Sequence, residues 1–504
     1  MSAILEWVNS LVWGAPALIA ILAVGLWLTL RTGFVQLRLL PEALRRFFHQ
    51  LRGGESADGT VSPFQAVCTA LAATVGTGNL AGVAGAMAIG GPGAIFWMWV
   101  CAFLGMATKF AEASLAVRYR HRDDGGEYVG GPMYMIRKGM GKGWHWLAWI
   151  YSFFGIIAAF GVGNATQVNT VISGVNEALS AFGFRQTLEA DLLMGIGLAV
   201  LIVSMLLGGM KRIGAVAERL VPFAAAAYLL LGAAVLLMKA DQLPEAFQSI
   251  FLGAFSPRAV TGGMVGSVFS ALRIGVSRGV FTNEAGMGTA AIAHAAAQVE
   301  HPAQQGMMGI VEVFLDTVVI CTVTALVILV SGVPIPYGHD TGMALTSQAF
   351  SYVLGSWVNV FLAAALCCFA IATVLGWGLY GIRCAQYLLG HKAWRPFVLL
   401  QAGAVIAGAV LNTGTVWLLS EIVNGLMAVP NLIALAALSG EAAQIAKDYK
   451  RTGGTYEDIH QCQPLRAFAH AKVPSSGGEG RATRKKDPPS EYRPAGYRNS
   501  GNFL

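Results

Sequence analysis

Apolar residues follow one another along this chain in long runs that are separated by short polar connections. About 20 predominantly apolar residues are enough for a helix to cross the hydrocarbon core of a bilayer. A shorter amphipathic run at residues 242–255 predicts a surface helix instead. The eleven runs long enough to cross are roughly residues 12–30, 64–88, 93–117, 147–178, 190–208, 215–238, 261–292, 306–332, 355–382, 396–412 and 414–440. The pattern therefore predicts an all-α polytopic membrane protein with about eleven transmembrane helices.

The second predicted span is interrupted in its middle. Two glycines and two β-branched residues lie together there: Thr74, Gly76, Thr77 and Gly78. An unpaired backbone amide or carbonyl in hydrocarbon costs several kcal/mol, so a broken helix persists only where it lines a cavity or a bound ligand. This break predicts a binding site inside the membrane.

The seventh predicted span has a comparable interruption between Ser270 and Thr289, with four glycines, two arginines and one carboxylate. If span 1 is a peripheral addition, spans 2–6 and 7–11 form two five-helix halves that each open on a broken helix. Because each half has an odd number of spans, the halves face opposite ways. This arrangement predicts an inverted-repeat secondary transporter with its site at mid-membrane.

The two halves correspond to residues 63–238 and 261–440, within a membrane domain at residues 1–450. The alternative interpretation is that the glycines only permit close helix crossing, but two clusters at matching positions favour broken helices. Each break exposes carbonyls at one half-helix end and N–H groups at the other. Such a break is suited to hold a sodium ion and a zwitterionic amino acid together.

Composition and charge support this class. The chain is 55% hydrophobic and only 12% charged, whereas soluble domains have about 25% charged residues. Lys and Arg collect in alternate loops, a bias that predicts an external N-terminus and a cytoplasmic C-terminus. Residues 451–504 are rich in polar residues and predict a disordered cytoplasmic tail. No HExxH motif and no repeated filter sequence occurs, so we expect neither an enzyme nor a channel, and no nucleic-acid partner.

Several longer motifs together resemble the alanine/glycine:cation symporter family of the amino acid–polyamine–organocation superfamily. The motifs are Gly76–Gly82, Gly90–Trp99, Gly105–Glu112, Gly130–Tyr134 and Thr282–Gly288. The resemblance covers about residues 10–450 and implies the bacterial leucine-transporter fold. It also implies sodium-coupled uptake of alanine or glycine across a prokaryotic plasma membrane. Sodium would be the coupling ion, with no other cofactor. Alternatives are a carrier of glutamine or serine, or coupling to protons.

The resemblance implies residue roles as well. It assigns sodium-coordinating positions to Ala72, Val75, Ala370 and Thr373. It assigns substrate contacts to Thr77, Gly78, Asn79, Gln167, Ser277, Gly279 and Trp377. Trp377 taken alone would be a packing or interfacial aromatic, and an amide such as Gln167 often links helices. The spacing of four places Thr373 and Trp377 on one helix face.

Ionisable residues inside predicted spans are further candidates. Lys109 and Glu112 are three residues apart and are expected to pair along one helix. Arg278 and Glu284 are hypothesised to pair across the second break as part of a gate. Asp316 is a candidate ligand for a second sodium ion or a proton.

Overall fold

The computed structural model describes residues 2–51, 61–123, 126–180, 183, 185–261, 267–339, 342–411 and 414–452. Within these ranges the chain is almost entirely helical. The strands found there form one antiparallel ribbon of β1 (His121–Arg122) and β2 (Tyr128–Val129). The predicted disordered tail lies outside the described residues from residue 453 onward.

The first part of the described chain, up to residue 261, forms seventeen helical segments. They are α1 (Ser2–Val12), α2 (Ala15–Arg31), α3 (Val35–Leu51), α4 (Pro63–Thr74), η1 (Gly78–Gly82), α5 (Val83–Gly90), α6 (Gly93–Tyr119), α7 (Pro132–Gly139), η2 (Lys142–Trp144), α8 (His145–Phe160), η3 (Gly161–Ala165), α9 (Thr166–Ser180), α10 (Leu188–Leu206), α11 (Gly209–Met238), η4 (Ala240–Gln242), α12 (Leu243–Phe255) and α13 (Pro257–Thr261).

The remaining helices begin at the second break. They are α14 (Val268–Asn283), α15 (Thr289–Ala295), α16 (Pro302–Val313), η5 (Phe314–Cys321), α17 (Thr322–Ser331), α18 (Met343–Leu354), α19 (Val358–Leu389), η6 (His391–Ala393), α20 (Trp394–Val410), α21 (Gly414–Ala437) and α22 (Ser439–Thr452). The segments η1, η3 and η5 are π-helical, and η2, η4 and η6 are 3-10 turns. Helix α12 is the predicted short amphipathic helix.

Nine helical segments of the described chain are long and apolar enough to cross a membrane, and a tenth is the bent pair of α4 with η1 and α5. The sequence predicts eleven spans, and the one that is missing from this count of ten is the seventh. There the chain forms two helices, α14 and α15, separated by the turn at residues 284–288. Neither helix alone has the 18 residues that a span requires in this count.

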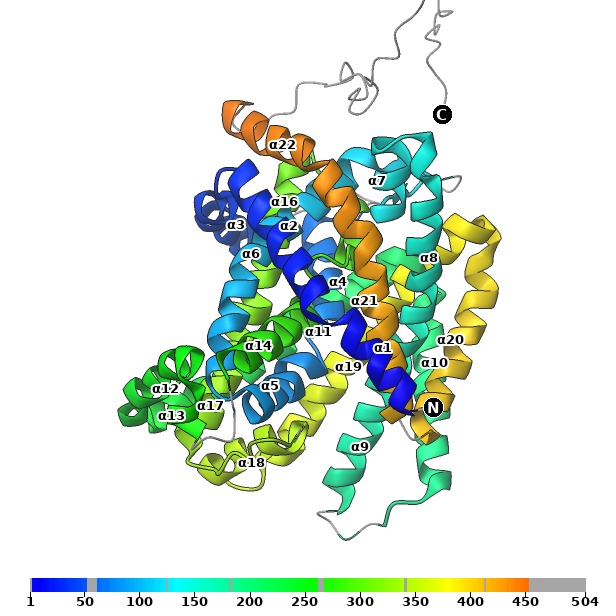
Figure 1. The fold of residues 1–504 in the computed structure, drawn as a ribbon. Coiled ribbons are helices and arrows are strands. Elements are labelled where there is room, and N and C mark those ends of the chain that lie inside the picture. Colours follow the sequence, from blue (N-terminus) through cyan, green and yellow to red (C-terminus); the bar gives the residue numbers. More distant parts are fainter. Residues whose placement is uncertain are drawn as a thin grey trace, which may run out of the picture. The chain divides into compact units, whose positions relative to one another are not determined.

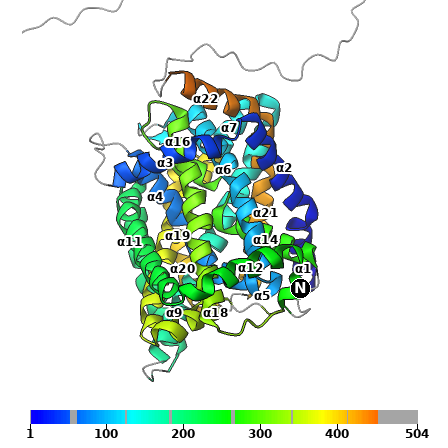
Figure 2. The same ribbon diagram turned by 90° about the vertical axis from the view of Figure 1, so that its left-hand side faces the viewer.

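The helices form a bundle whose two ends carry different elements (Figure 1, Figure 2). In both views α22 lies at one end with α3 and α7, whereas α12 and α18 lie at the other end. The start of α1 lies nearer to α12 and α18. The first and last described helices therefore mark opposite ends of the bundle.

The outward surface of the bundle is strongly apolar. On α10 and α11, Leu193, Phe223, Leu230 and Leu237 are each more than 70% exposed. Contiguous apolar surface of this kind is unfavourable in water and favourable in hydrocarbon. The inside of the bundle holds polar residues instead, including a completely buried lysine, Lys109. This reversal of polarity is typical of a membrane protein.

Local sequence signals explain where α4 begins and where it ends. Pro63 occupies the first turn, and Ser62 and Gln65 form a reciprocal capping box. The last α-helical amide is that of Val75, which donates to the Leu71 carbonyl. Val75 itself is extended, so the helix stops in the middle of the predicted span, where the glycines follow. The break predicted in span 2 is confirmed, with a bend of 52° between its two helical parts.

Candidate functional site

The break after α4 releases a carbonyl group toward a neighbouring helix. In an uninterrupted helix the Gly76 amide would donate to the Ala72 carbonyl. Here the Gly76 N–H donates to Asn79 Oδ1 at 2.8 Å instead. The Ala72 carbonyl accepts from Thr373 Oγ1 of α19 at 2.9 Å. The break thus places a hard oxygen, which its own helix no longer uses, next to a hydroxyl group.

Several predicted site residues converge on Gly76. A Cβ atom on this glycine would lie 3.0 Å from Thr373 Oγ1 and 3.8 Å from Gln167 Oε1. Gln167 belongs to α9, and its Oε1 accepts from Thr77 Oγ1 at 3.5 Å. Both Thr77 and Gln167 are buried. Three segments far apart in the sequence therefore meet at the first break, through α4, α9 and α19.

Trp377 lies one turn beyond Thr373 and is completely buried. Its indole Nε1 donates to Glu284 Oε1 at 3.1 Å, and its ring meets Tyr380 edge to face. A Cβ atom on Gly163 would overlap the Trp377 side chain, so only glycine permits this approach. The indole is consequently held between the π-helical segment η3 and the second break.

The second break lies at the end of the predicted interval between Ser270 and Thr289. Helix α14 continues through Gly275, Ser277 and Gly279, and ends only at Asn283. Glu284 is left-handed, with φ 53°, and two of the four residues after it are glycines with positive φ. A break therefore does occur in the predicted interval, but Gly275 and Gly279 are not part of it.

The first two glycines of that span serve helix packing. A Cβ atom on Gly279 would lie 3.2 Å from Cys101 Cβ of α6, and one on Gly275 would overlap the Ala94 carbonyl. The Cα of Gly279 therefore faces α6, and its place in a substrate pocket remains a prediction. Ser277 is half-buried on the same helix. The close-crossing interpretation is correct for these two glycines.

The hypothesised gate pair is also wrong. Arg278 forms an ion pair with Glu421 of α21, at 3.6 Å. Both oxygens of the Glu284 carboxylate are used elsewhere, since Oε1 accepts from Trp377 and Oε2 from the Thr289 hydroxyl. Glu284 thus joins the second break to α19 and does not cross it to reach Arg278.

Asp316 lies in the π-helical segment η5 and forms a second polar centre. Asn79 Nδ2 donates to Asp316 Oδ1 at 2.6 Å, and Thr317 Oγ1 donates to Oδ2 at 2.8 Å. Asn283 Nδ2 in turn donates to Thr317 Oγ1 at 3.3 Å. All four residues are buried. The side chain of Asn79 therefore faces Asp316, and the two breaks meet η5 at this point.

A third group of polar residues lies between α6, α15 and α16. Lys109 Nζ pairs with Glu312 Oε1 at 2.9 Å, and His294 Nε2 is 3.1 Å from Glu312 Oε2. The predicted pair of Lys109 with Glu112 is wrong, because Glu112 points to the second break. Its Oε1 accepts from the amides of Gly286 and Gly288 at 2.9 and 3.1 Å.

The charges of this interior are unequal. Around the two breaks, the described residues include one completely buried lysine, Lys109, and four buried carboxylates: Glu112, Glu284, Glu312 and Asp316. Neutral donors form hydrogen bonds to three of these carboxylates, and Glu312 alone contacts the lysine. Oε2 of Glu112 has no hydrogen-bond partner among the described residues. A buried carboxylate is costly as an ion, so each of these groups is either protonated or balanced by a nearby positive charge.

Sequence reasoning missed two partners of the site. Asn431 of α21 donates from Nδ2 to Glu112 Oε1 at 2.7 Å and to the Gly286 carbonyl at 2.9 Å. Asn283, which donates to Thr317 Oγ1, was missed as well. Each of these residues could have been noticed as a polar side chain in an apolar span. The sequence pattern does not indicate, however, which helix such a side chain contacts. Asn164, by comparison, donates to the Gln401 carbonyl of α20 and simply links two helices.

The three π-helical segments of the described chain all lie at these centres. Segment η1 holds Gly78 and Asn79, η3 holds Gly163, and η5 holds Asp316 and Thr317. Such segments occur mostly as single turns within α-helices, often at functional sites, because they leave carbonyl groups without regular partners. A broken helix, a released carbonyl and buried charged groups are features that an ion and substrate site in a transporter requires.

Comparison with known proteins agrees with this geometry. The family model described as the sodium:alanine symporter family matches residues 1–461. The chain belongs to the sodium:alanine symporter family. Members of this family are symporters, so the protein is a sodium-coupled amino-acid symporter and not an enzyme.

Relatives in the sodium:alanine symporter family are similar over nearly their whole length. The "Sodium/alanine symporter AgcS" of Methanococcus maripaludis is 44% identical over 448 residues, which is 88% of this chain and 96% of the relative. An uncharacterized transporter of Haemophilus influenzae is 42% identical, over 89% and 96% of the two chains. The "Probable sodium/glutamine symporter GlnT" of Bacillus subtilis is 36% identical, over 88% and 89%.

A solved structure supports the fold of this family member. The crystal structure of MhsT in complex with L-phenylalanine, a transporter with the leucine-transporter fold, matches with a TM-score of 0.52. The match covers 78% of this chain and 99% of MhsT, at 12% sequence identity. At this identity the similarity concerns the fold alone.

Proposed function

We propose that this symporter takes up a small neutral amino acid, alanine or glycine, together with sodium by alternating access. The observation that carries the proposal is the Ala72 carbonyl, which the broken helix releases beside Thr373 Oγ1. Carbonyl and hydroxyl oxygens at a helix break are ligands that suit sodium. In this proposal the sodium ligands are the carbonyls of Ala72, Val75 and Ala370 and the hydroxyl of Thr373.

The substrate would bind beside this ion. Amide groups of the segment Thr77–Asn79 would hold its carboxylate, and the amide side chain of Gln167 would contact it from α9. Trp377 and Ser277 would border the side-chain pocket. A Cβ atom on Gly76 would lie only 3.0 Å from Thr373 Oγ1 and 3.8 Å from Gln167 Oε1, and this limited space supports a small substrate.

The proposed architecture has eleven spans, arranged as a peripheral first span and two inverted five-helix halves at residues 63–238 and 261–440. The N-terminus would lie outside and the C-terminus in the cytoplasm of a prokaryotic cell. The distribution of Lys and Arg among the loops supports this orientation. The opposite positions of α1 and α22 agree with an odd number of spans.

Uptake into proteoliposomes tests the proposed function. We expect labelled alanine to accumulate under an inward sodium gradient and to remain near background with potassium outside. Unlabelled glycine should compete strongly, whereas glutamine should compete at least tenfold more weakly because the pocket is small. Strong competition by glutamine would favour the alternative carrier, and proton-driven accumulation without sodium would contradict the coupling ion.

A second cation beside Asp316 is a separate prediction. We expect Asp316→Asn to raise the sodium concentration for half-maximal uptake about tenfold and to reduce the sodium Hill coefficient toward one, because the variant keeps the shape but removes the buried charge. Sodium titration of alanine uptake measures both values. Thr317→Ser, which keeps the hydroxyl group, is the control. An unchanged sodium curve in Asp316→Asn would exclude this carboxylate as an ion ligand.

A further inference from the structure

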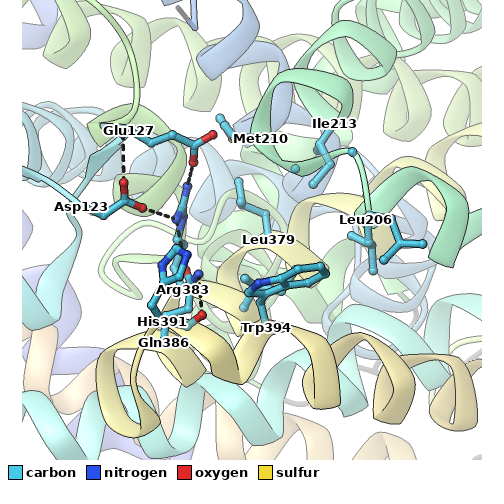
Figure 3. Close-up of a pocket in the computed structure, with 14 residues that line it drawn as sticks. Asp123, Glu127, Leu206, Met210, Ile213, Leu379, Arg383, Gln386, His391 and Trp394 are labelled. Atoms are coloured by element: carbon cyan, nitrogen blue, oxygen red, sulfur yellow. Dashed lines mark hydrogen bonds and ion pairs between the residues drawn. The ribbon is translucent and has the colours of Figure 1, made fainter. Parts of the chain in front are cut away.

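Arg383 forms an ion bridge between α19 and the β-ribbon. Its Nη2 lies 2.6 Å from Glu127 Oε2, and its Nη1 lies 3.5 Å from Asp123 Oδ2. Gln386 Oε1 accepts from Arg383 Nη1 at 3.0 Å. Figure 3 shows the guanidinium group between the two carboxylates, with the apolar side chains of Leu379 and Trp394 on its other side.

The ribbon holds both carboxylates in place. Asp123 N–H donates to the Glu127 carbonyl, and Glu127 N–H donates to Asp123 Oδ1, each at 2.9 Å. These two hydrogen bonds extend the pairing of β1 with β2. The carboxylates are therefore presented by one small rigid unit that begins directly after α6.

The bridge joins α19 to the ribbon that follows α6. Helix α6 packs on α14, α15 and α16, and β2 also contacts α15. Helix α19 packs most extensively on α8 and α9, and it also contacts α4 and α15 of the two breaks. Rotation of α19 relative to the ribbon would therefore separate Arg383 from its two carboxylates.

Two cavities lie against the bridge, each of about 330 Å³. Glu127, Met210 and Arg383 line both of them. The first cavity also has an apolar wall from α10, α19 and α20, and the second is bordered by the ribbon and the start of α11. Glu127 and Arg383 of the bridge therefore border both cavities, and separation of the two side chains would change the lining of each.

The same helix carries the proposed ion and substrate ligands. Thr373 and Trp377 precede Arg383 on α19, and ten residues correspond to about 15 Å along a helix axis. The bridge lies toward the end of the bundle where α7 and α22 are found, since the ribbon lies between α6 and α7 in the chain. The bridge therefore lies on the same helix as the proposed ligands and nearer to the α22 end of the bundle.

We propose that the bridge of Arg383 to Asp123 and Glu127 is the gate on the α22 side of the transport path, which is closed in this structure. The proposal rests on the alternating access of the proposed function. Opening exchanges the protein partners of Arg383 for water and joins the two cavities into one vestibule. The side chain of Glu127 is 46% exposed, so the bridge is weak enough to break in each cycle.

Cysteine accessibility tests the gate in the full chain reconstituted in liposomes. Met210 is buried beside the bridge, so Met210→Cys reports whether the vestibule is open. A membrane-impermeant maleimide added on the α22 side is expected to label this cysteine about tenfold faster when Arg383→Gln or Glu127→Gln is also present. The protein without Met210→Cys gives the background from the native cysteines.

Arg118→Gln is the matched control, because Arg118 and Glu441 form an ion pair of similar burial that borders neither cavity. This variant should leave labelling unchanged. Equal acceleration by Arg118→Gln, or no acceleration by either gate variant in correctly folded protein, overturns the proposal. If Arg383→Gln does not fold, the labelling rate of Glu127→Gln alone tests the gate, because the glutamine amide has nearly the same shape as the glutamate carboxylate.

The labelling experiment tests the gate, and the uptake experiment tests the proposed function, so a negative result in one does not decide the other. If the unmodified protein does not accumulate alanine but the gate variants still accelerate labelling, the substrate assignment is wrong and the gate stands. If the protein transports alanine and labelling does not respond, the gate is wrong and the proposed function stands. The paired exchange Arg383→Glu with Glu127→Arg should restore slow labelling, which a loss of general stability would not do.

Discussion

Thr373→Ala is expected to raise the sodium concentration for half-maximal alanine uptake by about tenfold or more, which corresponds to the loss of one oxygen ligand worth roughly 1–3 kcal/mol. The hydroxyl of Thr373 is the side chain that contacts the released Ala72 carbonyl, at 2.9 Å. Its removal leaves that carbonyl without its observed partner and removes an ion ligand. Sodium titration of labelled alanine uptake in proteoliposomes is the measurement.

Thr373→Ser is the matched control for this prediction, since serine keeps the oxygen and lacks only the methyl group. We expect it to retain most of the sodium affinity. The alanine concentration for half-maximal uptake at saturating sodium should change little in Thr373→Ala, because the ligand belongs to the ion. A sodium response equal to that of the unmodified protein would show that Thr373 is not an ion ligand.

Lys109→Met is expected to destabilise the folded protein by about 3–5 kcal/mol, the usual cost of removing one partner from a buried ion pair. Both Lys109 and Glu312 are completely buried, so the remaining carboxylate would have no water to solvate it. Glu312 also contacts His294, which links the ion pair to α15 of the second break. The measurement is the thermal unfolding midpoint of purified protein in detergent.

The double variant Lys109→Met with Glu312→Leu is the control, because it removes both charges together. We expect it to recover much of the lost stability, since apolar replacements of a buried pair are often neutral. A single variant as stable as the unmodified protein would contradict the prediction. A double variant less stable than the single variant would show that Glu312 acts mainly through His294.

The Thr373 prediction concerns the first break, and the Lys109 prediction concerns the polar residues next to the second break. At the first break the polar groups connect α4 to α19, and they include the residues that are proposed to bind sodium. Around Glu112 and Glu312 the polar groups connect α6, α15 and α16, which carry the second break. The polar contacts at the first break connect α4 to α19, whereas those around Glu112 and Glu312 hold α6, α15 and α16 together. Loss of the first is therefore expected to affect transport, and loss of the second to affect stability.

The sequence by itself determined the class of protein, the approximate positions of ten candidate spans and the first break. Long apolar runs with few charges are stable in a bilayer, so their approximate positions can be predicted from the chain. The segment Ala72–Asn79 combines glycines and β-branched residues where hydrocarbon demands a regular helix. The interruption of this segment could therefore be predicted. The exposure of backbone carbonyl and N–H groups at the break could be predicted as well.

Only the tertiary structure decided which glycines break a helix and which groups pair. Gly275 and Gly279 weaken a helix in isolation, yet close packing on α6 keeps α14 continuous past them. Lys109 pairs with Glu312, and Arg278 with Glu421, across more than a hundred residues of sequence. Helix propensity and local spacing act over a few residues, whereas buried charges choose partners by proximity in space. Candidate polar residues could therefore be named from the chain, but helix packing decided which of them form hydrogen bonds and ion pairs with one another.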